Sequence, residues 1–385
     1  MGFLGRLFGF GKKGAAGVDI GSSSIKISYL EETKKGLVLS KLGFINTPKG
    51  ALRDGRILDA SALSESIKQL YDSLNCPTRK VISAVGGQTV LVRPIVLPQM
   101  SEKDLNKTLQ YEAERYLPYS ISDAQIACQI IQKSIPGNEK NMEVLLVSAQ
   151  KELIQNVVEA LEMAGLEAVA MDLEPFALLR SLQLSVPIEK FKQTLCVINL
   201  GASYSSINII KNGILRHSRN ISTGGDSFTK TIAQSMNLTF EEAEKLKVEK
   251  GIIRTGEETK PVEPVSMRIF NVVSPLLKEF IVEIQRSFDY YRSRYKGELV
   301  EHIIITGGGA CFCNIDKFLN NEIGIPVEIC NFIDNSGVRI GKDVQFTKER
   351  LSELAPEFTI CIGLGMREIM LENPAKYQQA GFEVN

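Results

Sequence analysis

The chain has 385 residues, 44% of them hydrophobic and 23% charged, and its 45 basic and 45 acidic side chains give a formal net charge of +0. This length allows two or more hydrophobic cores, and the balanced charge gives no electrostatic indication of binding to nucleic acid or to an acidic membrane. The 7 cysteines and 2 histidines lack the spacing of a zinc site, so we expect no metal-ligand cluster. The odd number of cysteines fits reduced thiols in a cytoplasmic protein.

The N-terminal residues 1–16 are apolar but rich in glycine, and we expect a flexible end. An alternative is a short amphipathic helix that places Phe3, Leu4, Leu7 and Phe8 on a membrane or a partner. No apolar run in the sequence reaches the length of a membrane-spanning helix, so no direct span is expected.

Residues 17–28 contain the most informative motif, in which apolar residues alternate on both sides of a short turn. Asp19 ends the first predicted strand, where a carboxylate can hold a hydrated divalent cation, and Lys26 on the returning strand can reach a phosphate. The turn itself offers backbone N–H groups and hydroxyls that can converge on phosphate oxygens. Its residues are Gly21, Ser22, Ser23 and Ser24. Taken alone, the motif also fits an ordinary hairpin.

The next elements complete the first half of an α/β domain. Residues 37–44 are predicted to be extended, and Asp59 is predicted to cap a helix that continues to Asn75. Residues 81–87 form a buried strand that ends in glycines. From residue 90 to residue 165 the pattern changes to strands and helices that we interpret as a small α+β insertion. The chain then returns to the first domain with a strand over 166–171 and a helix that begins near Pro175.

A second domain is predicted from Thr194 onward, because residues 197–207 repeat the strand, glycine turn, serine and strand pattern. Helices follow near Gly225, over 240–249 and over about 265–295. A buried strand over 303–306 then enters a glycine-rich turn, and a helix, a strand over 327–330 and a final helix near 360–371 complete the chain.

Two phosphate hairpins on duplicated halves, followed by a glycine turn, resemble the actin-like ATPase superfamily over nearly the whole chain. Residues 89–98 (TVLVRPIVLP) and 111–119 (YEAERYLPY) resemble the inserted subdomain of the PilM-type type IV pilus assembly proteins, which are related to the cell-division protein FtsA. Residues 362–367 resemble the closing helix of that family.

The resemblance implies an actin-like (ribonuclease H-like) α/β fold with two duplicated domains and a small α+β insertion in the first. The expected divisions are a flexible end (1–16), a first domain 1A (17–89 plus 166–193), a 1C-like insertion (90–165), and a second domain 2A/2B (194–385, with 2B about 222–300).

The resemblance also implies ATP and Mg²⁺ as cofactors and assigns roles to individual residues. Asp19 would lie near the metal ion, Lys26 would contact the phosphates, and Glu174 would order an attacking water. Glu244 and Lys247, three apart on one helical face, match the pair that holds the ribose, although such a pair is also common on solvated helices. The remaining nucleotide contacts are expected from Gly21, Ser22, Ser23, Ser24, Gly201, Ala202, Ser203, Gly225, Gly307, Gly308 and Gly309.

One residue departs from the family pattern. The second phosphate hairpin of the superfamily begins with aspartate, whereas this chain has Asn199. A neutral amide holds a metal ion weakly, through water, so hydrolysis is expected to suffer more than nucleotide binding. The alternative is that Asp19 suffices for the metal ion.

The function that the resemblance implies is an ATP-binding adaptor of pilus assembly, cytoplasmic and peripheral at the inner membrane, with slow or absent ATPase activity. Its expected partner is the cytoplasmic tail of a PilN-like inner-membrane protein, held as an extended peptide between the insertion and the first domain. Tyr111, Tyr116, Leu117 and Tyr119 could contact that peptide or pack the insertion's own helix. The pilus motor ATPase and other assembly proteins are further expected partners. A small-molecule kinase and a filament-forming ATPase remain alternatives on the same fold.

Overall fold

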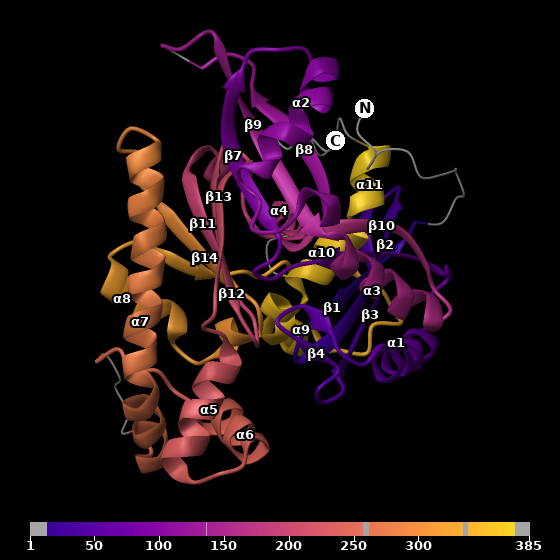
Figure 1. Ribbon diagram of the computed structural model, residues 1–385. Coiled ribbons are helices and arrows are strands. Elements are labelled where there is room, and N and C mark those ends of the chain that lie inside the picture. Colours follow the sequence, from indigo (N-terminus) through magenta and orange to yellow (C-terminus); the bar gives the residue numbers. More distant parts are fainter. Residues whose placement is uncertain (1–13, 136, 257–261, 334–337, 374–385) are drawn as a thin grey trace.

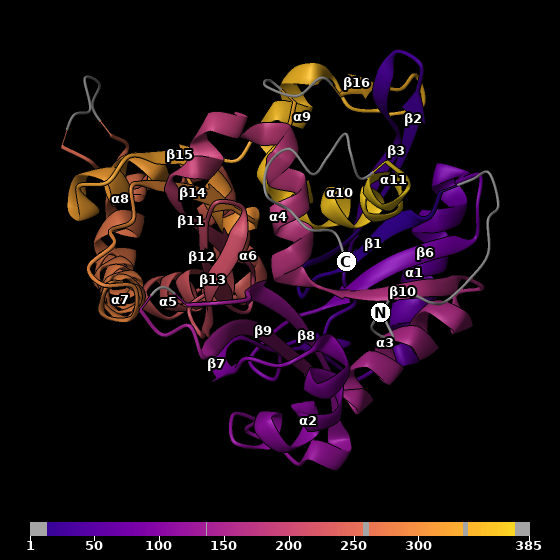
Figure 2. The same ribbon diagram turned by 90° about the horizontal axis from the view of Figure 1, so that it is seen from above.

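The structure, a computed structural model, describes residues 14–135, 137–256, 262–333 and 338–373. Its framework is two β-sheets whose strand orders are β10-β6-β1-β2-β3-β16 and β13-β12-β11-β14-β15. Figure 2 shows helices α4 and α10 between the two sheets. A third, three-stranded sheet (order β7-β9-β8) forms the upper part of the molecule in Figure 1.

The two large sheets repeat one topology, which confirms the predicted duplication. In each, three consecutive strands pair antiparallel, and the first of them also pairs with a parallel strand from later in the chain. The first sheet consists of β1 (Ala16–Ile20), β2 (Ser24–Thr33), β3 (Gly36–Asn46), β6 (Lys80–Val85), β10 (Glu167–Leu173) and β16 (Arg339–Ile340). The second consists of β11 (Thr194–Leu200), β12 (Ser205–Lys211), β13 (Ile214–Ile221), β14 (His302–Thr306) and β15 (Val327–Ile329).

Helix α1 (Ala60–Leu74) forms where the sequence predicted it. The side chain of Asp59 accepts a hydrogen bond from the backbone N–H of Ala62, and Asn75 ends the helix in the left-handed conformation. Between β3 and α1 lies a short hairpin that the sequence did not predict, with strands β4 (Leu52–Arg53) and β5 (Arg56–Ile57).

The insertion consists of β7 (Leu91–Pro98), α2 (Glu102–Glu114), β8 (Ala124–Gln132) and β9 (Asn141–Gln150). The predicted insertion also contained the following helix, α3 (Lys151–Met163), and this boundary differs in the structure. Leu153, Val157 and Leu161 of α3 join the apolar cluster of the first sheet, because their spacing directs them toward that core. The insertion therefore ends at about residue 150.

Four helices belong to the second domain: α5 (Gly225–Met236), α6 (Phe240–Lys250), α7 (Pro264–Arg294) and α8 (Ile315–Ile323). Their apolar residues share one cluster with inward-facing residues of β11, β12 and β14. They thus cover one face of the second sheet, as Figure 1 shows for the long helix α7.

The C-terminal segment differs from the predicted division, in which residues 194–385 formed the second domain. Strand β16 pairs with β3, and α10 (Thr359–Gly365) packs on β1, β2 and α4 (Glu174–Ser185). The cause is close backbone packing: a Cβ on Gly363 would lie 1.8 Å from the carbonyl oxygen of Ala177, and one on Gly17 would lie 2.2 Å from that of Cys361. The remaining helices of this segment are α9 (Lys348–Leu354) and α11 (Arg367–Glu372).

Within the described residues, no helix combines the length and apolar character needed to cross a membrane. The predicted flexible end, apart from residues 14–16, lies outside those residues.

Candidate functional site

The two predicted phosphate hairpins have the same turn geometry. The N–H of Gly21 donates to the carbonyl oxygen of Ser24, and the N–H of Gly201 donates to that of Tyr204, both at 3.1 Å. Each turn leaves two residues at its tip, Ser22 and Ser23 in one and Ala202 and Ser203 in the other. The second hairpin is therefore a structural repeat of the first.

The two hairpins differ in charge. Across the first, Asp19 is paired with Lys26, and the Lys26 Nζ lies 3.6 Å from the Asp19 Oδ2. Both side chains are buried, and this burial raises the pKa of the Asp19 carboxyl despite the nearby lysine. At the corresponding positions the second hairpin pairs the neutral Asn199 with Ser206. The ionic groups of the two turns thus belong to the first hairpin alone.

The three glycines of the predicted nucleoside turn have different surroundings. A Cβ on Gly307 would lie 2.4 Å from the Asn199 Oδ1, and Gly307 has a φ of +85°. A Cβ on Gly309 would lie 2.2 Å from the Leu200 Cγ. Gly307 and Gly309 are thus required by the protein's own packing. A Cβ on Gly308 would have its nearest contact at 4.0 Å, the Cγ of Glu357, so at this position the turn presents bare backbone to open space.

Glu174, at the start of α4, contacts the second hairpin. The hydroxyl of Tyr204 donates a hydrogen bond of 2.7 Å to the Glu174 Oε1. Burial raises the pKa of Glu174 to about 7; the Tyr204 hydrogen bond opposes this rise, Asp19 adds to it and Lys26 opposes it. The carboxylate also fills the space beside Gly86, where a Cβ would lie 2.1 Å from its carbon. Glu174, Tyr204, Asp19 and Lys26 therefore form one electrostatic group.

The predicted ribose-binding pair lies beside the start of α5. The Lys247 Nζ is 2.7 Å from the Glu244 Oε2 and 2.8 Å from the Thr229 Oγ1, which also donates to Glu244. The N–H of Gly225 donates to the Gly201 carbonyl at 2.8 Å, which ties this helix terminus to the second hairpin. The pair is therefore positioned beside the second phosphate hairpin.

These residues fit ATP and a hydrated Mg²⁺. The opening above Gly308 suits a flat base, and two glycine turns with the start of α5 suit phosphate oxygens. A single buried carboxylate on the first hairpin, that of Asp19, suits a magnesium ion that keeps most of its waters. In the part of the chain that the structure describes, no three histidine, cysteine, aspartate or glutamate side chains are grouped to bind a metal ion directly.

Sequence reasoning missed three contributors to this site: Tyr204, Thr229 and Gly86. Tyr204 was part of the quoted second motif, but its reach to Glu174 depends on how the domains face each other. Thr229 lies four residues after Gly225 on α5, so helical spacing could have placed it near the second hairpin.

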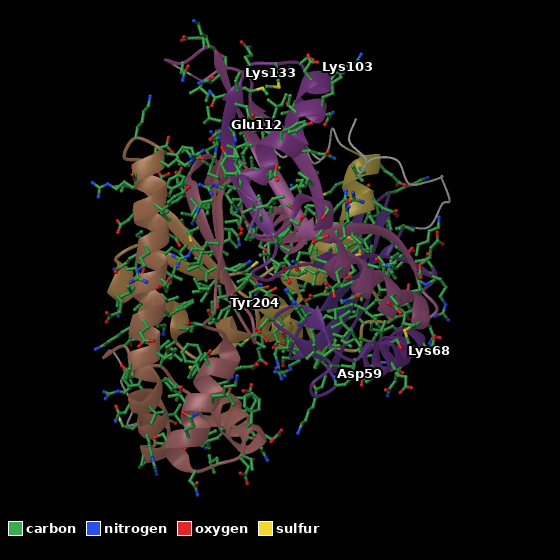
Figure 3. The ribbon with its side chains drawn as sticks, viewed as in Figure 1. Asp59, Lys68, Lys103, Glu112, Lys133 and Tyr204 are labelled. Atoms are coloured by element: carbon green, nitrogen blue, oxygen red, sulfur yellow. The ribbon has the colours of Figure 1, made fainter. Side chains whose placement is uncertain are left out.

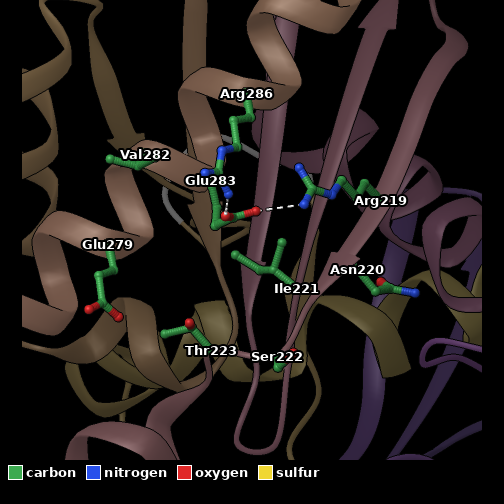
Figure 4. Close-up of a pocket in the computed structure, with 9 residues that line it drawn as sticks. All are labelled: Arg219, Asn220, Ile221, Ser222, Thr223, Glu279, Val282, Glu283 and Arg286. Atoms are coloured by element: carbon green, nitrogen blue, oxygen red, sulfur yellow. Dashed lines mark hydrogen bonds and ion pairs between the residues drawn. The ribbon is translucent and has the colours of Figure 1, made fainter.

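A separate pocket of about 480 Å³ lies between the end of β13 and α7 (Figure 4). Within it, Glu283 pairs with both Arg219 and Arg286. The pocket contains none of the predicted site residues.

Comparison with known proteins gave a family and several relatives. Residues 17–369 match the family described as Type IV pilus assembly protein PilM. The cell division protein FtsA of Streptococcus pneumoniae serotype 2 is 22% identical over 403 aligned positions, covering 95% of this chain and 85% of that protein. FtsA of Bacillus subtilis is 27% identical over 261 positions, and this match spans 61% of this chain and 57% of that protein.

Among solved structures, a chain of a PilM-PilN type IV pilus biogenesis complex superposes with a TM-score of 0.80 and 27% identity, covering 93% of this chain and 99% of that chain. The ethanolamine utilization protein EutJ of Carboxydothermus hydrogenoformans has a TM-score of 0.53 and 14% identity, covering 93% and 90% of the two chains. The second likeness concerns the fold alone. The structure and its neighbours confirm the actin-like α/β fold.

Proposed function

Since the chain belongs to the PilM family of type IV pilus assembly proteins, we propose that it is an ATP-binding adaptor that links a PilN-like membrane protein to the assembly machinery. It would work at the cytoplasmic face of the inner membrane and be held there by its partner. The observation that supports the proposed nucleotide binding is the matching geometry of the glycine turns at Gly21 and Gly201. The second of these hairpins also lies against the glycine-rich turn at Gly307, through Asn199.

ATP would lie between the two large sheets, with its phosphates at the two hairpins. Lys26 would neutralise phosphate charge, and Asp19 would hold the magnesium ion through water. The base would lie on the bare backbone at Gly308, and Glu244 with Lys247 would face the ribose. Bound Mg²⁺ would offset the phosphate charge. Lys26, beside Asp19, is the positive charge that the chain itself would add.

Hydrolysis would be slow for two reasons. Asn199 replaces a metal-facing carboxylate with an amide that carries no charge. In addition, Glu174, the carboxylate proposed to order water, already accepts a hydrogen bond from the Tyr204 hydroxyl. The Glu174 oxygen that accepts this hydrogen bond is therefore not free to accept one from an attacking water.

The partner's extended tail would dock on the insertion. Within the described residues, β8 is the end strand of its sheet, and an end strand can pair with an added peptide strand. Tyr111 of the neighbouring helix α2 is 78% exposed, which leaves its ring available to such a peptide. Tyr116 and Leu117 instead pack within the insertion, and the Tyr119 hydroxyl lies 2.9 Å from the Ser148 Oγ.

The experiment titrates a synthetic peptide with the cytoplasmic sequence of the same organism's PilN-like protein into the full chain. Tyr111→Ser should weaken peptide binding several-fold, because an exposed aromatic contact is lost. Val248→Ser on α6 is the matched control, since Val248 is 73% exposed and lies on the second domain. Absence of peptide binding, or equal loss in both variants, would contradict docking on the insertion.

A further inference from the structure

The sheet of the insertion is covered on both faces. Met142, Val144 and Leu146 of β9 share a cluster with α2. The alternate residues Leu145 and Val147 share a different cluster with α4 and the second sheet. An antiparallel sheet at a protein's edge commonly leaves one face to solvent. Here that face lies on the second domain, and both views show β7 next to β13.

A buried carboxylate fastens this interface. Glu143 lies on the same face of β9 as Leu145, and only 6% of it is exposed. Its Oε2 accepts a hydrogen bond of 2.5 Å from the Arg216 Nη1 of β13. Its Oε1 lies 3.2 Å from the Tyr295 hydroxyl and 3.7 Å from the Arg294 Nη2, at the C-terminal end of α7. Glu143 is thus held by three side chains of the second domain.

The second domain also holds the neighbouring strand and the segment that leads from the first domain into the insertion. Arg294 donates through Nη2 to the carbonyl oxygen of Pro94 in β7 at 3.0 Å. Asn220, next to the end of β13, donates through Nδ2 to the carbonyl oxygen of Gly87 at 2.7 Å. Polar contacts therefore join the insertion to the second domain along β7 as well as at Glu143.

The other end of the insertion is embedded in the first domain. Strand β9 runs directly into α3, whose apolar residues pack in the core of the first sheet. Ala149, near the end of β9, is in that same core. The insertion thus connects the two domains, in addition to the packing of α4 and α10 between the sheets.

We infer that the insertion is a strap across the two domains, fastened by Glu143, and that it limits opening of the nucleotide cleft. Opening the cleft would pull Glu143 away from Arg216 and Arg294 and leave buried charges without partners, which is strongly unfavourable. This inference rests on the proposed nucleotide binding. Because coupling between sites is reciprocal, a peptide docked on the insertion would change nucleotide retention, and a bound nucleotide would change peptide affinity.

The test measures release of a fluorescent, slowly hydrolysed ATP analogue from the full chain with Mg²⁺ by stopped flow. Glu143→Gln and Arg216→Met should each speed release by about tenfold or more, because each leaves the strap unfastened. The double variant should release no faster than the faster single variant, because both changes undo one fastening. Glu112→Gln is the matched control: Glu112 lies on α2 (Figure 3) and pairs with Arg115, the residue that follows this helix, so the variant should release at the parent rate.

Thermal unfolding establishes that each variant is folded. If Glu143→Gln does not fold, Tyr295→Phe replaces it in the release experiment, because this change removes only the hydroxyl beside Glu143. We expect Tyr295→Phe to speed nucleotide release severalfold. If the folded Glu143→Gln variant, or Tyr295→Phe in its place, releases nucleotide at the parent rate, the proposal that the insertion acts as a strap is refuted. The proposal that the chain binds nucleotide would still stand. A parent chain that retains no nucleotide would instead refute the proposed function and the strap with it.

Discussion

Replacing Glu174 with glutamine tests the electrostatics of the group formed by Glu174, Tyr204, Asp19 and Lys26. In the folded chain, burial raises the pKa of this carboxyl to about 7 from its ordinary value of 4.5. The folded state therefore binds the proton more tightly than the unfolded chain does. The stability that Glu174 contributes is fully present below pH 4.5 and is lost as the pH rises through about 7.

The size of this loss follows from the shift. One pKa unit corresponds to about 1.4 kcal/mol, so a fully buried group with this shift would lose about 3 kcal/mol. Glu174 is half-buried and solvent screens its charge. We therefore expect about 1–2 kcal/mol. Glutamine resembles the neutral acid and does not titrate. The free energy of unfolding of Glu174→Gln, measured relative to the parent, should rise by that amount between pH 5 and pH 8.

Urea unfolding followed by circular dichroism at several pH values across that interval measures the difference. Tyr204→Phe is the second variant: it removes the hydrogen bond that lowers the pKa of Glu174, so the loss of stability should move to higher pH. A difference between Glu174→Gln and the parent that stays constant with pH would refute this reasoning.

Three further predictions address the nucleoside turn, the metal position and the domain assignment. Gly308→Val should lower ATP affinity, measured by calorimetry, by about 100-fold with little loss of stability. Gly309→Ala should instead lower the free energy of unfolding, measured in urea, by about 1–3 kcal/mol. ATP binding by Gly308→Val equal to that of the parent would exclude this turn from the site. Asn199→Asp should raise the phosphate-release rate several-fold with little change in ATP affinity, and an unchanged rate would mean that another residue limits hydrolysis. Gly363→Ala should cost about 1–3 kcal/mol in urea unfolding, because its methyl group would overlap the backbone of Ala177, and a stability equal to the parent's would contradict the observed packing of α10 on α4.

Local chemistry explains what could be predicted from the sequence. The alternation of apolar residues around a glycine-serine turn specified the first hairpin, and antiparallel register then places Asp19 opposite Lys26. The N-terminal cap of α1 followed from Asp59. The same turn pattern near Gly201 predicted the duplicated topology. Each of these features depends on residues close together in the chain.

Features that depend on long-range packing were missed. Nothing local distinguishes α3 as a helix of the first sheet rather than of the insertion, since both placements bury the same apolar face. The C-terminal helix α10 lies on the first sheet because Gly17 and Gly363 allow backbones to touch, and only the folded chain brings those partners together. The contact between Tyr204 and Glu174 likewise joins residues from two domains.

The most direct test of the account is a calorimetric titration of the parent chain with ATP in the presence and absence of Mg²⁺. The account predicts one ATP per chain with a Kd of about 1 μM or lower when Mg²⁺ is present. It also predicts weakened binding for Lys26→Ala, which removes the cation beside Asp19. A parent chain that shows no saturable binding of ATP at millimolar concentration would contradict it.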